Sequence, residues 1–84
     1  MITLDLHKRT KSEAQILLTS FLHEEHEKRS QSALIIFGYG KNILSELVIK
    51  EVNSSKYVLK YEKAHPSIGG AGAIVVFFNK KNKN

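Results

Sequence analysis

Residues 33–37 read Ala33-Leu34-Ile35-Ile36-Phe37, an unbroken apolar run that is followed directly by Gly38-Tyr39-Gly40. A short continuous apolar run predicts a strand that is buried on both faces, at the centre of a sheet. The glycines after it predict a tight turn. Apolar residues at positions 44, 47, 48 and 52 then have the spacing of an amphipathic helix that ends near residue 53. This stretch therefore predicts a central strand, a turn and a helix in succession.

The segments on either side of this stretch complete the fold. Ile2, Leu4 and Leu6 alternate with polar residues, which predicts a strand with one buried face. Apolar residues between positions 14 and 22 predict a helix over roughly residues 12–29. Residues 57–61 and 74–78 have the composition of two further strands. The resulting βαβαββ order, with right-handed crossovers, predicts an α/β two-layer sandwich in which two helices cover a mixed sheet of about four strands.

Length and composition predict one domain. The chain has 84 residues, which suffice for a single core at residues 1–79, and we expect the basic tail at residues 80–84 to be disordered. The absence of cysteine excludes disulfides and thiolate metal sites. No apolar run approaches the roughly 18 residues of a membrane span, and the N-terminus lacks the pattern of a secretory signal. We therefore expect a cytoplasmic protein with no membrane partner, and the oligomeric state stays open.

The charge balance favours an anionic partner. Thirteen Lys and Arg residues against eight Asp and Glu residues give a formal net charge of +5. A basic domain of this kind suits DNA or RNA. An ordinary solvated surface explains the same composition, so charge alone does not decide the function.

The first candidate site consists of Asp5 and His7. Strand alternation sends Leu4 and Leu6 to the core and places Asp5 and His7 side by side on the other face. A carboxylate beside an imidazole can activate water, take a proton from a ribose hydroxyl or hold a divalent metal such as Mg²⁺. Polar residues are also commonplace on the solvent side of a strand, so the pair has a purely structural alternative.

The second candidate site is the turn of Gly38, Tyr39, Gly40 and Lys41, between a predicted strand and a predicted helix. Glycines permit a close backbone approach, while exposed N–H groups and the helix dipole favour a phosphate. Lys41 would add a direct phosphate contact, and Tyr39 would stack on an unpaired base. The alternative is a turn with no ligand, because two glycines separated by one residue are a weak signal.

The third candidate site is a glycine-rich loop with Gly69, Gly70 and Gly72, just before the last strand. Lys63 and His65 come shortly before it, and we expect the loop to face the turn of the second site. The alternative is that glycines are needed here because the loop packs tightly over the edge of the sheet.

Four motifs occur in a specific order along the chain. They are Leu4-Asp5-Leu6-His7, the helix start Glu13-Ala14, the hydrophobic strand that leads into Gly38-Tyr39-Gly40, and Gly69-Gly70-Ala71-Gly72-Ala73. From Leu4 to about Phe78, this order resembles the Smr (small MutS-related) domain. The family occurs at the C-terminus of MutS2-type proteins, as stand-alone small proteins and in some pentatricopeptide proteins. It includes DNA-nicking and RNA-cleaving members and members that mainly bind. The resemblance implies that Asp5 and His7 match the residues implicated in cleavage.

Five positions depart from the usual motifs of the family. Phe37 replaces the histidine of the second motif, and Tyr39 and Asn42 replace a frequent lysine and a further glycine. Lys8 replaces the usual glycine after the histidine of the first motif. Ile74 replaces the usual threonine of the third motif and removes a hydroxyl that could bind a phosphate or a loop carbonyl. The scaffold residues are therefore kept better than the residues that handle substrate.

Three hypotheses follow. The first is a nucleic-acid-binding Smr-like domain that acts as an endonuclease, with Asp5 and His7 catalytic. The second, motivated by Phe37, is a non-catalytic module of a MutS2-type protein that binds nucleic acid or the ribosome. The third is a protein–protein interaction domain, which explains the composition equally well. The sequence assigns no cofactor and no metal ligand, and leaves open both a divalent metal such as Mg²⁺ and the choice between DNA and RNA. The assigned nucleic-acid contacts are Lys8, Gly38, Tyr39, Gly40, Lys41, Gly69, Gly70 and Gly72.

Overall fold

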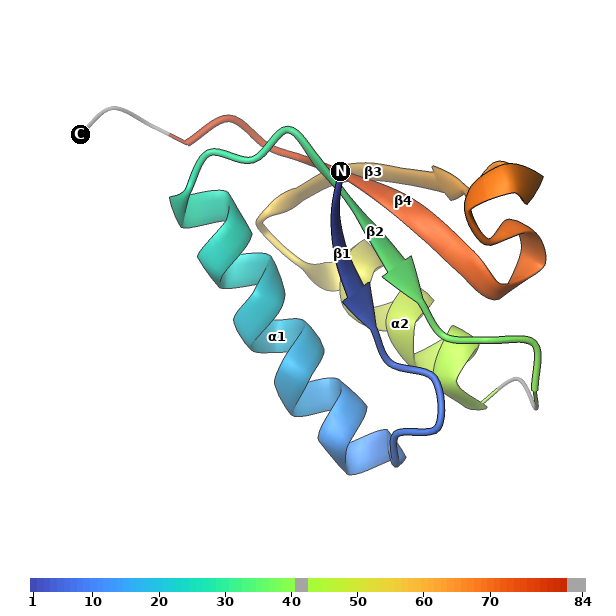
Figure 1. Ribbon diagram of the computed structural model, residues 1–84. Helices are drawn as coiled ribbons and strands as arrows, with labels where there is room; N and C mark the ends of the chain where they lie inside the picture. The colour runs from blue at the N-terminus through green and yellow to red at the C-terminus, as the bar shows by residue number, and fades with distance from the viewer. Residues whose placement is uncertain (41–42, 82–84) are drawn as a thin grey trace.

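The computed structural model describes residues 1–40 and 43–81. The described residues form β1 (Ile2–Asp5), α1 (Lys11–Glu27), β2 (Ser32–Ile36), α2 (Ile43–Ser54), β3 (Val58–Lys63), the 3₁₀ turns η1 (Pro66–Ile68) and η2 (Gly70–Gly72), and β4 (Ala73–Phe78) (Figure 1). The predicted βαβαββ order is confirmed, and each element lies close to its predicted range. The first strand ends at Asp5, so His7 lies just beyond it.

The strand order places both helices on the same face of the sheet. The order is β1-β2-β4-β3, with β1 parallel to β2 and β4 antiparallel to both of its neighbours. The crossover through α1 leads from β1 to β2, and the crossover through α2 leads from β2 past β4 to β3. Because both crossovers step in the same direction across the sheet, right-handed connections put both helices on one side. The predicted two-layer α/β sandwich with a mixed sheet is therefore confirmed.

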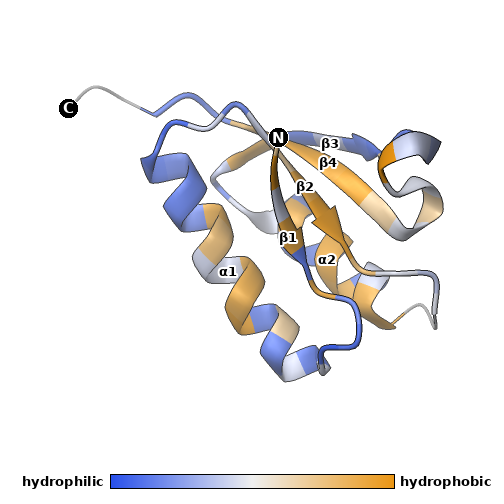
Figure 2. Ribbon diagram, in the orientation of Figure 1, coloured by the Kyte–Doolittle hydropathy of each residue, from blue (hydrophilic) through white to orange (hydrophobic). Residues whose placement is uncertain are grey.

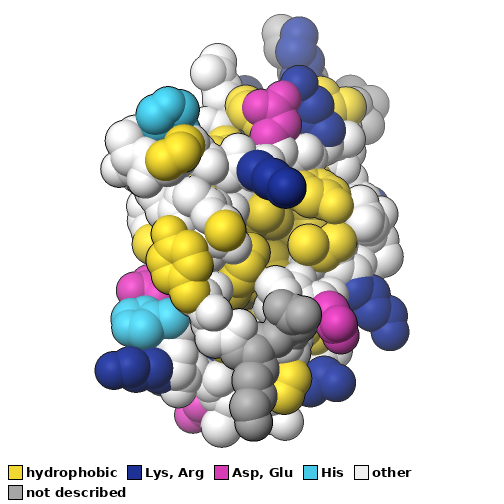
Figure 3. Space-filling model, turned by 90° about the vertical axis from the view of Figure 1, so that its right-hand side faces the viewer, with side chains coloured by type: hydrophobic (Ala, Val, Ile, Leu, Met, Phe, Trp, Pro, Cys, Tyr) yellow, Lys and Arg dark blue, Asp and Glu magenta, His cyan; other side chains and the backbone are white. Residues whose placement is uncertain are grey.

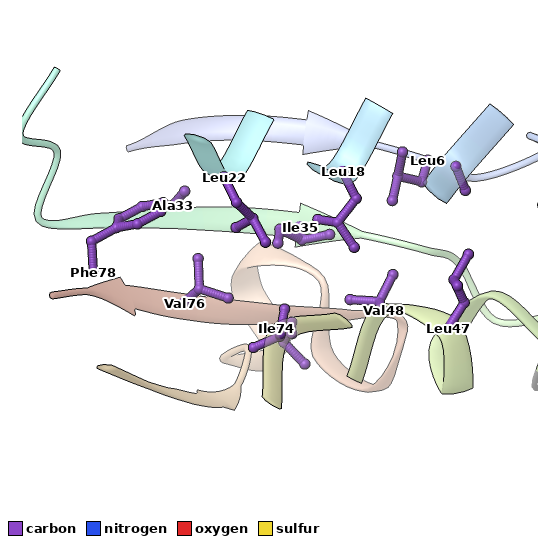
Figure 4. Packing of buried hydrophobic residues seen from close by; sticks show 12 residues of the cluster. Leu6, Leu18, Leu22, Ala33, Ile35, Leu47, Val48, Ile74, Val76 and Phe78 are labelled. Carbon is purple, nitrogen blue, oxygen red and sulfur yellow. The ribbon is translucent and has the colours of Figure 1, made fainter. Parts of the chain in front are cut away.

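The main hydrophobic core lies between the helices and the sheet. Leu18 and Leu22 of α1 and Val48 of α2 pack over Ile35 of β2 and Val76 of β4, and all five are at most 3% exposed (Figure 4). Figure 2 shows the matching pattern along the chain, with hydrophobic residues concentrated in β2 and β4. Burial of a Leu, Ile or Val side chain contributes about 1.5–3 kcal/mol, so this layer supplies much of the stability.

No α-helix of the described residues covers the opposite face of the sheet, which has a smaller apolar cluster. Leu34 and Val75 are each 8% exposed there, and Ile36 and Phe77 are partly buried around them. Leu34 and Ile35 are thus both buried, on opposite faces of β2, as the apolar run predicted. Asp5 pairs with Ile36 across the sheet, so its side chain lies on this open face.

A capping box fixes the start of α1 and the loop that precedes it. The Oγ1 of Thr10 accepts a hydrogen bond from the Glu13 N–H at 3.2 Å, and the Glu13 carboxylate accepts from the Thr10 N–H at 2.9 Å. Hydrogen bonding of the carboxylate to Thr10, first through the backbone N–H and then through the side chain, holds the pKa of Glu13 below its ordinary value. The N–H of Arg9 donates to the Leu6 carbonyl at 3.1 Å, so the loop after β1 is anchored at both ends.

The C-terminal segment returns to α1. Lys81 forms an ion pair with Glu27 near the end of that helix. Residues 82–84 lie outside the described residues, so the disorder expected of the tail at residues 80–84 stays a prediction.

Candidate functional site

Three segments that are far apart in the sequence meet at one edge of the sheet. The parallel strands β1 and β2 both end at this edge, and the antiparallel strand β4 begins there. Asp5 pairs with Ile36, and Ile36 pairs with Ala73, so these three residues form a row across the sheet. The loop after β1, the turn after β2 and the glycine loop before β4 therefore leave the sheet side by side (Figure 1).

Asp5 and His7 form a hydrogen-bonded pair. The Nδ1 of His7 lies 2.6 Å from the Asp5 Oδ1, and the backbone N–H of His7 donates to the same oxygen at 3.0 Å. These contacts hold the pKa of Asp5 below its ordinary value of 3.8, with the His7 side chain as the largest cause. A carboxylate on Nδ1 favours the tautomer that has its proton there, which leaves Nε2 as an acceptor. Both side chains are about half exposed, 48% for Asp5 and 51% for His7, so a ligand can reach Nε2.

The turn after β2 packs directly against the glycine loop. The N–H groups of Phe37 and Gly38 both donate to the Gly72 carbonyl, at 2.9 and 3.0 Å. A Cβ at Gly72 would lie 3.1 Å from the carbonyl carbon of Gly38, which is tighter than a normal contact. A Cβ at Gly38 would lie 3.3 Å from the Cβ of His7, so the turn also contacts the first site. The three predicted sites are therefore one continuous surface.

Tyr39 ties the turn to the glycine loop a second time. Its hydroxyl donates to the Gly69 carbonyl at 2.9 Å, while the residue stays 76% exposed. This tether keeps a ring face open to a ligand. Because the Gly38 N–H is already bonded to Gly72, that amide is not available to an anion. Within the described residues, the hydrogen-bond pattern leaves the N–H groups of Tyr39 and Gly40 as the available donors of the turn.

Basic side chains follow the Asp5–His7 pair in the chain. Lys8 is exposed and has a φ of 65°, the left-handed conformation that favours glycine. A glycine at this position would adopt the same conformation without strain. Arg9 contributes to the lowered pKa of Asp5 through its charge. Sequence reasoning missed Arg9, although its position next to Lys8 was an available signal.

Three residues in or near the predicted sites do not join this surface in the described part of the chain. Lys41 lies outside the described residues, as does Asn42. His65 serves a structural role at the start of η1, because its Nδ1 accepts a hydrogen bond from the Ser67 N–H at 3.1 Å. Lys63 lines a separate hollow on the far side of the glycine loop.

Residues 1–40 and 43–81 contain no group of three or more His, Asp or Glu residues arranged to hold a metal ion. Asp5 and His7 could supply two protein ligands, and a bound ion would need the rest from water or substrate. In the same part of the chain, no helix is long and apolar enough to cross a membrane.

Comparison with known proteins identifies the architecture. The family model described as "Smr domain" matches residues 4–79. The Smr domain of MutS2 from Thermus thermophilus has a similar structure, with a TM-score of 0.89 and 24% identity over 94% of this chain and 99% of that one. YdaL, a stand-alone small MutS-related protein from Escherichia coli, also has a TM-score of 0.89, with 27% identity over 93% of this chain. This chain spans 64% of YdaL. No curated protein sequence matches it. The chain belongs to the Smr domain family.

Proposed function

We propose that this Smr domain binds nucleic acid at the edge where the three loops meet and cleaves a phosphodiester bond there. The observation that supports the proposal is the 2.6 Å contact between Asp5 and His7, beside a turn that has free amide donors and an exposed aromatic ring. A carboxylate that orients a histidine leaves the far ring nitrogen free to act as a general base.

The proposed chemistry uses the side chains and amides of this edge together with solvent. The Nε2 of His7 takes the proton of the attacking hydroxyl, which belongs to water or to a ribose. The new phosphorus–oxygen bond forms as the bond to the leaving oxygen breaks, and the leaving oxygen takes a proton from solvent. Asp5 stabilises the resulting imidazolium. The charges of Lys8 and Arg9 and the N–H groups of the turn stabilise the negative charge on the phosphate.

The test is a combined binding and cleavage assay on labelled single-stranded RNA, single-stranded DNA and supercoiled plasmid, with magnesium and with chelator. Asp5→Asn should abolish cleavage and retain most of the binding, because the amide no longer orients the His7 ring. Glu62→Gln is the matched control, since it makes the same carboxylate-to-amide change on β3, which is separated from β1 by β2 and β4. Full cleavage by Asp5→Asn would contradict the catalytic assignment.

The second candidate function is a binding module without catalysis, such as a nucleic-acid or ribosome contact of a MutS2-type protein. It is favoured by Phe37, which replaces the histidine usual in the second motif. In this case binding occurs without cleavage, is insensitive to Asp5→Asn and weakens as salt is added. If the domain binds no nucleic acid even at low salt, both functions are contradicted and a protein partner is favoured.

A further inference from the structure

A hollow of about 350 Å³ lies on the far side of the glycine loop from the Asp5–His7 pair. It is bounded by the turn after β2, the N-terminal half of α2, the end of β3 and the start of β4. Figure 3 views this side and shows a hollow with hydrophobic side chains at its base and a Lys or Arg side chain across it. The lining residues are Phe37, Ser45, Ile49, Tyr61, Lys63, Gly70, Ala71, Ala73 and Ile74.

The lining combines an apolar base with aromatic side chains. Phe37 and Tyr61 are partly buried, while Ile74 is 3% exposed and forms part of the base. None of the lining residues is acidic, in contrast to the larger groove between α1 and α2, which is lined by Glu46 and Glu51. A volume near 350 Å³ is at the lower end of the range of about 300–1,000 Å³ typical of small-ligand sites, so it suits one ring system.

The mouth of the hollow is positively charged and adjoins the candidate site. Lys63 is exposed and forms no ion pair with any of the described residues. Gly70 is shared between the two surfaces, because a Cβ at that position would lie 3.3 Å from the Tyr39 hydroxyl. A single nucleic-acid strand that contacts Tyr39 can therefore continue over Gly70 to Lys63 without crossing an acidic side chain of the lining.

We propose that this hollow holds one unpaired nucleobase of a single-stranded nucleic acid whose backbone is bound at the Asp5–His7 edge. The base stacks on the aromatic lining, and Lys63 contacts its phosphate. Two of the residues that depart from the usual family motifs, Phe37 and Ile74, lie in this hollow and make it apolar. The inference rests on the proposed nucleic-acid binding and goes beyond it, because it makes this domain prefer unpaired bases.

The test compares a single-stranded oligonucleotide that contains 2-aminopurine with an abasic oligonucleotide of the same length. RNA and DNA forms of both are titrated at the same series of salt concentrations, from low to physiological. The wild-type domain should quench the 2-aminopurine emission and bind the abasic strand about tenfold more weakly. Ala71→Gln fills the hollow from an exposed position and should remove this difference while affinity for the abasic strand is kept.

Charge is tested by Lys63→Gln, with Lys60→Gln as the matched control. Both lysines are exposed on β3, but Lys60 pairs with Phe77 and Lys63 with Ile74, so they lie on opposite faces of the sheet. Lys63→Gln should weaken binding of the base-bearing strand several-fold more than Lys60→Gln does. Thermal unfolding of each variant verifies that the fold is intact.

The outcomes separate the two proposals. Equal affinity of the wild-type domain for the base-bearing and abasic strands overturns the base-binding inference and leaves the proposed function standing. A preference for bases that survives in Ala71→Gln also overturns it. If neither oligonucleotide binds at any salt concentration, the proposed function itself fails.

Discussion

The contact between Gly38 and Gly72 joins the turn after β2 to the glycine loop. Replacing Gly72 tests whether these two segments pack as closely as the structure shows. Gly72→Ala adds a Cβ that would lie 3.1 Å from the Gly38 carbonyl carbon and 3.3 Å from its Cα and oxygen. All three are backbone atoms, so no flexible side chain can move away. Relief requires the two loops to separate, which lengthens the hydrogen bonds from Phe37 and Gly38 to the Gly72 carbonyl.

The expected loss in free energy of unfolding is about 1–3 kcal/mol, the usual cost of overpacking. For a domain of this size, the midpoint of thermal unfolding falls by about 4–8 °C per kcal/mol, or about 4–24 °C in total. Circular dichroism or calorimetry measures the change directly.

Gly40→Ala is the control in the same region. A Cβ at Gly40 has no atom within 4 Å, and Gly40 does not have a left-handed φ. This variant should be unchanged or more stable by about 0.4–1 kcal/mol, because alanine restricts the unfolded chain. An unfolding midpoint of Gly72→Ala equal to that of the wild type would refute the close docking, as would an equal loss in both variants.

Three further predictions concern the loop after β1. Lys8→Gly should raise the free energy of unfolding by about 0.5–1 kcal/mol, because Lys8 has a φ of 65°, and should weaken nucleic-acid binding; a lower stability in denaturant titration would contradict this. Thr10→Ala removes the capping box with Glu13 and should cost about 1 kcal/mol in the same titration, with the idea rejected if stability is unchanged. His7→Ala should raise the pKa of the Asp5 carboxyl toward 3.8, measured by carbon NMR. An Asp5 titration curve that is the same in His7→Ala and in the wild type would refute the pairing. Since the folded pKa of Asp5 is lowered, the stabilising contribution of its carboxylate is present above about pH 4 and is lost as the pH falls through the folded pKa.

The elements of the fold could be predicted because their signals are local. The periods of the apolar residues depend on the strand and helix geometry of each segment, and the apolar run at residues 33–37 was long enough to indicate the central strand. The adjacency of Asp5 and His7 follows from the same local rule, although His7 lies beyond the end of β1 and is held by its backbone N–H on the Asp5 carboxylate. The position of Lys63, on a hollow separate from that pair, had no local signal.

The sequence by itself determined the fold class, the family motifs and the pairing of Asp5 with His7, because residues one or two positions apart are constrained by bond geometry alone. Only the tertiary structure decided that the Gly72 carbonyl accepts hydrogen bonds from the N–H groups of Phe37 and Gly38. The N–H groups of Tyr39 and Gly40 are then the described donors of the turn that are available to a phosphate. It also decided that the turn, α2 and the glycine loop surround a hollow. These features depend on segments some 30 residues apart, which come together because long-range hydrophobic burial and strand pairing bring their ends to one edge of the sheet.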